Sequence, residues 1–185
     1  MDRCSSRRAI ESFASEMSEI ESKTQIRLAI KQGNLEEVTQ LINSNPGLRD
    51  VMTPFGTWLH VAASAGQLDV VKQLVRAGMD INRQGGIAGG NALTEAAEEG
   101  HLEVVEYLLD EGSSMLLAES EWNPLFAAIQ AGNAAIVRLL LERGIDATVA
   151  YSGPTVKDFD AYAFAMEQGQ KEIAAHIKSW LERNA

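Results

Sequence analysis

The side chains most able to do chemistry in this sequence are three histidines, one cysteine and many carboxylates. His60, His101 and His176 lie far apart, and no two have the four-residue spacing that places two metal ligands on one helical face. Cys4 has no histidine near it in the sequence, so it forms no recognisable nucleophile pair. No Gly-x-Ser-x-Gly motif occurs either. These patterns predict no metal, no cofactor and no catalytic residue, and an enzyme is the least favoured class.

A glycine-rich run, GGIAGG at residues 85–90, is the one segment that resembles a phosphate-binding loop. It lacks the Lys-Ser or Lys-Thr pair that follows the glycines of a P-loop. The chain before it is predicted to be the end of a helix, whereas a P-loop follows a strand. We therefore interpret the run as a flexible, elongated hairpin.

Three glutamates form the most distinctive polar group. Glu95, Glu98 and Glu99 have the i, i+3, i+4 spacing that brings side chains onto one face of a helix. Like charges at this spacing destabilise an isolated helix by roughly 0.2–0.5 kcal/mol per pair. Such a group is expected either as a solvated acidic surface or as a site for the Lys and Arg side chains of a partner protein.

The segments that carry these residues repeat along the chain. One series of glycines recurs at intervals of 33, 34, 32 and 37 residues: Gly33, Gly66, Gly100, Gly132 and Gly169. A second series, Gly78, Gly112 and Gly144, ends three of the units. Repetition at this period predicts a stacked array in which each unit buries its apolar face against its neighbours.

The clearest unit predicts two short helices. Thr57 precedes an apolar run and can cap the first helix, and Gly66 supplies the left-handed residue at which that helix ends. Leu68, Val71, Leu74 and Val75 then recur at helical spacing. Helices this short are marginal alone, so stacking must stabilise them.

This unit, GTWLHVAASAGQLDVVKQLVRAGMDIN at residues 56–82, resembles the ankyrin signature T-P-L-H-x-A-A-x-x-G-H and the helix that follows it. NALTEAAEEGH from Asn91 and NPLFAAIQAGN from Asn123 match in part, and the copies from Thr24 and Asp160 diverge more. The resemblance implies an all-α ankyrin-repeat solenoid of about five helix–turn–helix units. It also implies a structural role for His60, which would order the turn between units.

We expect two parts, a helical arm at residues 1–23 and a repeat domain at residues 24–185. Ile10, Phe13, Met17 and Ile20 share one helical face in the arm. This helix is expected to cap the open end of the stack, and a separate partner-binding helix is the alternative. No signal peptide and no run of 18 apolar residues is recognised, so a cytoplasmic location is expected.

The resemblance implies that positions five, eight and nine of each unit line a concave groove. Small residues flank the three glutamates at these positions: Ser64, Ala65, Ala127 and Ala131. Aromatic residues occur near the predicted hairpins and suit the rim of an interface, although Trp58 can equally pack between loops. The predicted partner-binding residues are Phe55, Trp58, Val61, Glu95, Glu98, Glu99, Glu121, Trp122, Gln130 and Tyr151.

The net charge is -10 at pH 7. This balance disfavours binding to nucleic acid or to an anionic membrane and favours a basic protein partner, although acidic proteins can also simply be soluble. Residues 123–170 are similar to bacterial ankyrin proteins encoded beside secreted polymorphic toxins, which implies an immunity protein that neutralises a toxin in the cytoplasm. A regulatory or host-directed adaptor with an unrelated partner is the alternative, and the free protein is expected to be a monomer.

Overall fold

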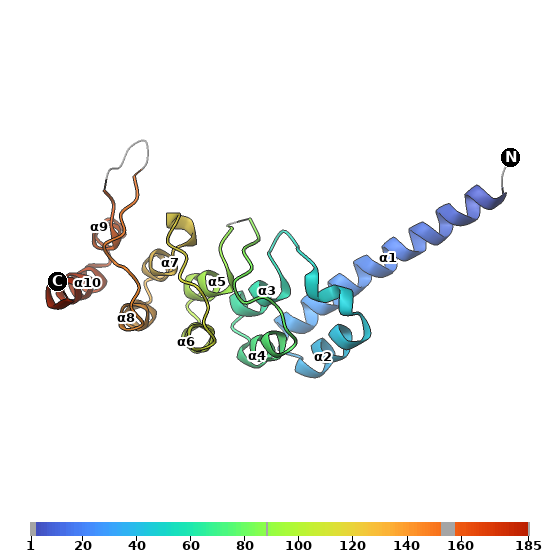
Figure 1. The fold of residues 1–185 in the computed structure, drawn as a ribbon, viewed down its shortest axis with the longest axis horizontal. Coiled ribbons are helices and arrows are strands. Elements are labelled where there is room, and N and C mark those ends of the chain that lie inside the picture. Colours follow the sequence, from blue (N-terminus) through green and yellow to red (C-terminus); the bar gives the residue numbers. More distant parts are fainter. Residues whose placement is uncertain (1–2, 88, 153–157, 185) are drawn as a thin grey trace.

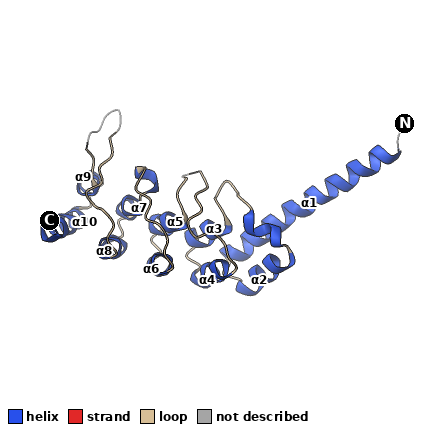
Figure 2. Ribbon diagram, viewed as in Figure 1, coloured by secondary structure: helices blue, strands red, loops and turns tan. Residues whose placement is uncertain are grey.

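The computed structural model describes residues 3–87, 89–152 and 158–184. Within these ranges the chain forms α-helices and two short 3-10 helices, and its only strand-like pairings are isolated bridges between Thr53 and Gly56 and between Tyr151 and Phe159 (Figure 2). The elements are α1 (Arg3–Lys31), α2 (Leu35–Ser44), η1 (Pro46–Asp50), α3 (Trp58–Ser64), α4 (Leu68–Arg76), α5 (Ala92–Glu98), α6 (Leu102–Asp110), η2 (Ser120–Trp122), α7 (Pro124–Gln130), α8 (Ala134–Glu142), α9 (Ala161–Glu167) and α10 (Lys171–Asn184).

The helices form antiparallel pairs that stack side by side. In Figure 1 the first helices α3, α5, α7 and α9 form one row, the second helices α4, α6 and α8 form another, and the connecting segments project from the first row. Neighbouring members of each row contact one another, from α3 through α9 and from α2 through α10. The predicted all-α array of helix–turn–helix units is therefore confirmed.

Glycine ends the helices as the spacing predicts. Gly66 follows α3 with φ 67°, and Gly78 follows α4 with φ 85°, both in the left-handed region where a side chain is strained. The same region is occupied by the other glycines of the two series: Gly33, Gly100, Gly112, Gly132, Gly144 and Gly169. At Gly66 the space is also filled, because an added Cβ would lie 2.5 Å from Nδ1 of His101.

The core runs through the whole stack. Leu59, Leu93 and Leu125 occupy the same place in α3, α5 and α7 and are at most 1% exposed. The second helices contribute the apolar stripe that the periodicity predicts, with Val71 and Leu74 of α4 both buried. Each helix thus buries its apolar face against the neighbouring units, which supplies the stability that such short helices lack alone.

Side-chain hydrogen bonds also join one unit to the next. The residue after the mid-unit glycine repeatedly bonds to a carbonyl of the preceding unit: Gln67 Nε2 donates to the Lys31 oxygen at 3.1 Å, and Asn133 Nδ2 donates to the Gly100 oxygen at 3.2 Å. His101 Nε2 lies 3.0 Å from the Ser64 oxygen in the same arrangement. These bonds satisfy carbonyl groups at the ends of the first helices.

The N-terminal helix differs from the expected cap. α1 is continuous from Arg3 to Lys31, and its N-terminal half extends away from the repeats (Figure 1). Met17 and Ile20 are 43% and 57% exposed, so this part of the expected apolar face covers nothing in the structure. Ile26 and Ile30, near the end of the same helix, are fully buried. The open end of the stack is therefore covered by the last turns of α1, which belong to the first repeat. The side chains of Ile10 and Phe13, which were also expected on the apolar face, are not among those that the structure describes.

The glycine-rich run forms the hairpin expected between the second and third units. The Gly85 N–H donates to the Gly90 oxygen at 3.0 Å, which closes the loop. A Cβ at Gly86 would lie 3.2 Å from the Gly56 nitrogen, so glycine allows this hairpin to approach the preceding one closely.

None of the helices that the structure describes has the length and apolar character needed to cross a membrane.

Candidate interaction groove

The first helices and the hairpin tips enclose an open cavity of about 530 Å³. Val61 and Ser64 of α3 and Ala65, the C-cap residue of that helix, line it together with Glu95 and Glu98 of α5. Its remaining lining residues come from α1, from the two neighbouring hairpins and from the C-cap of α5: Arg27, Lys31, Pro54, Phe55, Gly86, Ile87 and Glu99. The side chains of Ser64 and Ala65 are small, so they leave open the space beside the carboxylates of α5.

Glu95 has the most perturbed environment in this cavity. Burial is the main cause that raises the pKa of its carboxyl group to about 7, and the charges of Glu98 and Glu99 contribute to the same rise. The side chain is half-buried, whereas Glu98 and Glu99 are exposed. A cation placed here would favour the ionised form of Glu95 and relieve the repulsion within the group.

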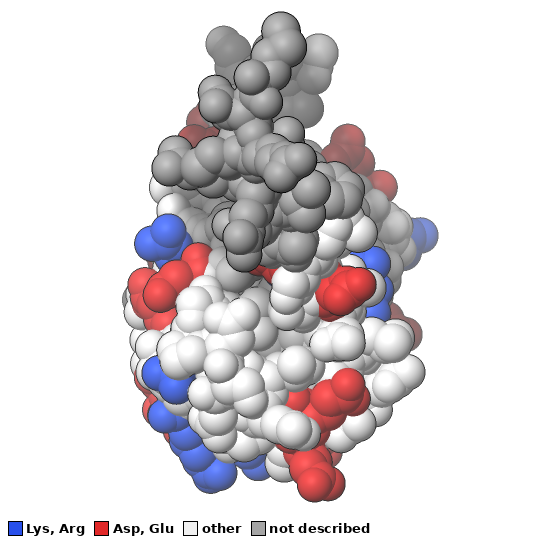
Figure 3. Space-filling model, turned by 90° about the vertical axis from the view of Figure 1, so that its right-hand side faces the viewer, with Lys and Arg blue, Asp and Glu red and all other residues white. Residues whose placement is uncertain are grey.

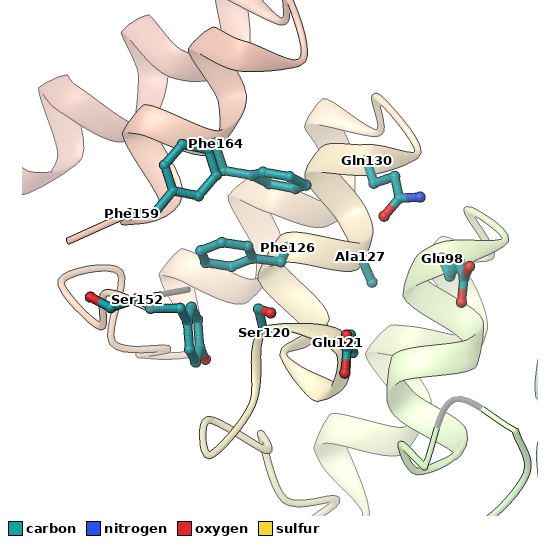
Figure 4. A pocket seen from close by; sticks show the side chains of 10 residues that line it. Glu98, Ser120, Glu121, Phe126, Ala127, Gln130, Ser152, Phe159 and Phe164 are labelled. Carbon is teal, nitrogen blue, oxygen red and sulfur yellow. The ribbon is translucent and has the colours of Figure 1, made fainter. Parts of the chain in front are cut away.

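A second cavity of about 450 Å³ continues the first toward the C-terminus. Glu98 lines both cavities, so they adjoin at α5, and together their lining includes residues of α3, α5, α7 and α9. In Figure 4, Ala127 and Gln130 of α7 lie between Glu98 on one side and the aromatic side chains on the other. We call the two cavities together the interaction groove.

Aromatic rings form the wall of the second cavity farthest from Glu98. Phe126 and Phe164 stack with their ring centroids 4.9 Å apart, and Tyr151 meets Phe126 edge-on at 5.1 Å. Phe159 packs edge-on against Phe164 at 5.8 Å. The Tyr151 hydroxyl donates to the Leu117 oxygen at 3.0 Å, which fixes the ring in place.

Eight of the ten predicted partner-binding residues line this groove: Phe55, Val61, Glu95, Glu98 and Glu99 in the first cavity, and Glu98, Glu121, Gln130 and Tyr151 in the second. Whether they contact a partner remains a prediction.

Two predicted residues do not line it. Trp58 is only 1% exposed, and its Nε1 donates to the Leu48 oxygen at 2.8 Å, so this side chain anchors η1 and offers no surface to a partner. Trp122 lies against the preceding hairpin, since a Cβ at Gly89 would be 2.8 Å from Trp122 Nε1. The assignment of Trp58 to the contact surface is therefore corrected.

The structure also adds two groove residues, Arg27 and Phe126, that sequence reasoning missed. Arg27 and Lys31 of α1 face the same cavity as the three glutamates, so that group does have basic residues near it. The Arg27 guanidinium lies 5.2 Å from the centroid of the Phe55 ring, a cation–π distance. Phe126 lies at the fourth position of its unit, where the second unit has His60. The fourth position alone does not predict either residue, because His60 and Thr94 at the same position are buried and line neither cavity.

His60 has the structural role that the resemblance implies. Its Nδ1 accepts from the Thr57 N–H at 3.2 Å, so its Nε2 carries the proton and donates to the Gly90 oxygen at 3.2 Å. Burial lowers the pKa of the ring, which keeps it neutral. His60 therefore connects the start of α3 to the next hairpin.

Within the described ranges, no three His, Cys, Asp or Glu side chains lie together as a metal site would require.

Figure 3 views the molecule from the end where α1 emerges. Where side chains are described on this face, acidic and basic groups are small and separate, and uncharged atoms predominate.

The chain matches a family model for ankyrin repeats in three overlapping stretches, residues 7–85, 26–117 and 59–151. Among curated proteins, the ankyrin repeat and SAM domain-containing protein 6 of Rattus norvegicus is 33% identical over 116 residues, which are 60% of this chain and 13% of that protein. The probable E3 ubiquitin-protein ligase XBOS33 of Oryza sativa is 35% identical over 117 residues, or 61% of this chain and 22% of the relative.

Zygote-specific protein 3 of Chlamydomonas reinhardtii is 36% identical over 94 residues, which are 50% of this chain and 24% of the relative. The chain thus spans less than a quarter of the length of each of these three relatives. Such matches show the repeat architecture, and they carry no activity over to this chain.

Proposed function

We propose that this chain, which belongs to the ankyrin-repeat family, is a non-catalytic module that binds a basic protein in the interaction groove. The observation that carries the proposal is the placement of Glu95, Glu98 and Glu99 in one open cavity with small side chains beside them. A Lys or Arg side chain of a partner fits the space and the charge. Repeat arrays offer extended grooves of this kind for protein recognition.

The electrostatics of the groove favour binding that depends on charge. The raised pKa of Glu95 reflects an unfavourable group of negative charges, and a bound cation would offset that cost. The net charge of -10 also attracts a positively charged partner over longer distances, which raises the association rate at low salt. Arg27 and Lys31 at one end would orient the partner, because they favour an acidic group there.

The test is a charge-reversal experiment with a matched control. A partner is captured with the wild-type chain and identified, and its affinity is measured for the triple variant E95K/E98K/E99K. We expect the dissociation constant to rise at least a hundredfold. The control is E111K/E142K/E182K, which changes the net charge equally at exposed positions in or at the ends of α6, α8 and α10. Equal loss in both variants, or no loss in the first, would refute the groove as the binding site.

A toxin-neutralising role is one specific form of this proposal. It rests on the expectation from the sequence that residues 123–170 are similar to bacterial immunity proteins, and an acidic groove would suit a basic toxin such as a nuclease. Such a protein would act in the cytoplasm. Co-expression with the product of the adjacent gene tests it: growth is restored by the wild-type chain and not by E95K/E98K/E99K. If no complex forms and no toxicity is relieved, this form of the proposal is wrong.

An adaptor role is the second candidate. The relatives named above include a SAM domain-containing protein and a probable ubiquitin ligase, in which the matched stretch is a minor part of a longer protein. A partner that is a regulatory protein rather than a toxin would favour this role. The groove experiment applies unchanged, since both roles use the same surface.

A further inference from the structure

We infer that the second cavity of the interaction groove is a binding pocket for a single arginine side chain of the partner protein. This inference rests on the proposed function and makes it more specific. The pocket has two unlike walls, aromatic rings on one side and carboxylates on the other. Arginine is the side chain whose planar, cationic head matches both.

The aromatic wall offers ring surfaces to a planar group. Phe126 forms the nearly buried base of this wall, and Phe164, Phe159 and Tyr151 pack around it with their side chains only partly buried. A guanidinium stacks on such rings, with favourable cation–π contacts at up to about 6 Å from a ring centroid. The aliphatic part of the side chain would cover apolar surface along the same wall.

The acidic wall supplies the charge. Glu98 and Glu121 are exposed at the rim opposite the rings (Figure 4). None of the described residues that line this cavity is Lys, Arg or His. Within that lining the two carboxylates therefore have no cation, and an incoming guanidinium would supply the missing charge through charge-assisted hydrogen bonds.

The geometry favours arginine over the other side chains that a groove can take. A leucine or phenylalanine would fill the space against Phe164 but leave the carboxylates unpaired. A lysine ammonium would meet the carboxylates, but it is a compact, strongly hydrated charge that does not stack as a planar group on the rings. Arginine makes both contacts at once.

Peptide binding to the free, full-length chain tests the inference without the natural partner. Isotope-labelled protein is titrated with Ac-Gly-Arg-Gly-NH2 and with the matched lysine, leucine and citrulline peptides, and NMR shifts of the Gln130 side-chain amide and Tyr151 ring are followed. We expect saturable shifts with the arginine peptide. Each of the other three peptides should bind at least fivefold more weakly, citrulline because it keeps the shape and loses the charge.

Two near-isosteric variants complete the experiment. E98Q/E121Q should weaken the arginine peptide at least fivefold and leave the leucine peptide unchanged, while the control E111Q/E142Q should bind both as the wild type does. Equal or tighter binding of lysine or leucine, or no saturable shift with arginine, would overturn the inference. The two tests can fail separately, because the charge-reversal test uses the whole partner and also changes Glu95 and Glu99, which line the first cavity and not the second.

Discussion

At the scale of single residues, Glu95 shows how the groove is set apart from the rest of the surface. Its carboxyl group is half-buried beside two further carboxylates, and the pKa of about 7 records the cost of ionising it there. A half-buried carboxylate beside two others lowers the stability of the fold, so stability alone does not explain a glutamate at this position. The cost is consistent with a site that is completed by a cation from outside.

The stability of the protein should therefore depend on pH through Glu95. Its pKa is raised on folding from 4.5 to about 7, so the folded state holds a proton that the unfolded state has released between these values. Stability contributed by this group thus falls as pH rises from 4.5 to 7 and is constant above. E95Q removes the effect, and we expect it to be more stable than the wild type at pH 8 by about 1 kcal/mol after allowance for solvent screening.

Urea denaturation at pH 4.5 and at pH 8 measures this difference. The gain from E95Q should shrink toward the lower pH, where the wild-type carboxyl is protonated in the folded state. E111Q, which removes an exposed carboxylate outside the groove, serves as the control. A gain for E95Q that is the same at both pH values would contradict the assignment of the raised pKa to this residue.

Replacing Gly66 lowers stability in two separate ways, through the strain of a side chain in the left-handed backbone region and through a clash with the His101 ring. G66A places a side chain at φ 67° and brings its Cβ within 2.5 Å of the His101 ring. At Gly112, φ is 83° and nothing lies within 4 Å of an added Cβ. We expect G112A to lower the free energy of unfolding by about 1–2 kcal/mol, the cost of the left-handed conformation. G66A should cost more because the ring must also move.

Chemical denaturation of G66A, G112A and the double variant G66A/H101A checks this reasoning. H101A removes the ring that an added Cβ at Gly66 would meet. The loss of unfolding free energy from H101A to G66A/H101A should therefore be similar to the loss from the wild type to G112A. Equal destabilisation by G66A and G112A in the wild-type background would show that the contact with His101 does not matter.

At the scale of elements, the helices follow from local sequence more directly than the groove does. Glycine spacing and apolar periodicity predict the helix pairs and their stacking, because each unit is built from contacts between near neighbours. Tyr151 and Phe159 come from the long connection before α9, and no repeat position predicts that Tyr151 meets Phe126 or that Phe159 meets Phe164. Arg27 was missed for the same kind of reason, since its place depends on how α1 stacks against the second unit.

The continuity of α1 leads to a prediction about its two halves. Deleting residues 1–17 should change the free energy of unfolding by less than about 0.5 kcal/mol, because that part of the helix extends away from the repeats. I30A should cost about 2–5 kcal/mol, because Ile30 is fully buried in the first repeat. Thermal or urea unfolding of both variants measures this. A large loss on deletion would show that the N-terminal half does cover the stack.

At the scale of the whole molecule, the groove changes in chemical character from one end to the other. Arg27 and Lys31 lie at its start, Glu95, Glu98 and Glu99 in its middle, and the aromatic cluster at its end. Adjacent helices pack about 8–10 Å apart, so the four steps from α1 to α9 span roughly 32–40 Å. An extended segment of about ten to twelve residues covers that length at roughly 3.3 Å per residue. A partner would therefore bind in one orientation.

The most direct measurement of the central claim is site-specific photo-crosslinking of the partner complex. A benzophenone side chain is introduced singly at Ser64 or Gln130, which line the groove, and at Glu103 or Arg138, which are exposed on α6 and α8 in the other helical row. We predict that the partner is captured from Ser64 and Gln130 and not from Glu103 and Arg138. Capture from the second pair alone would contradict the groove as the site of recognition.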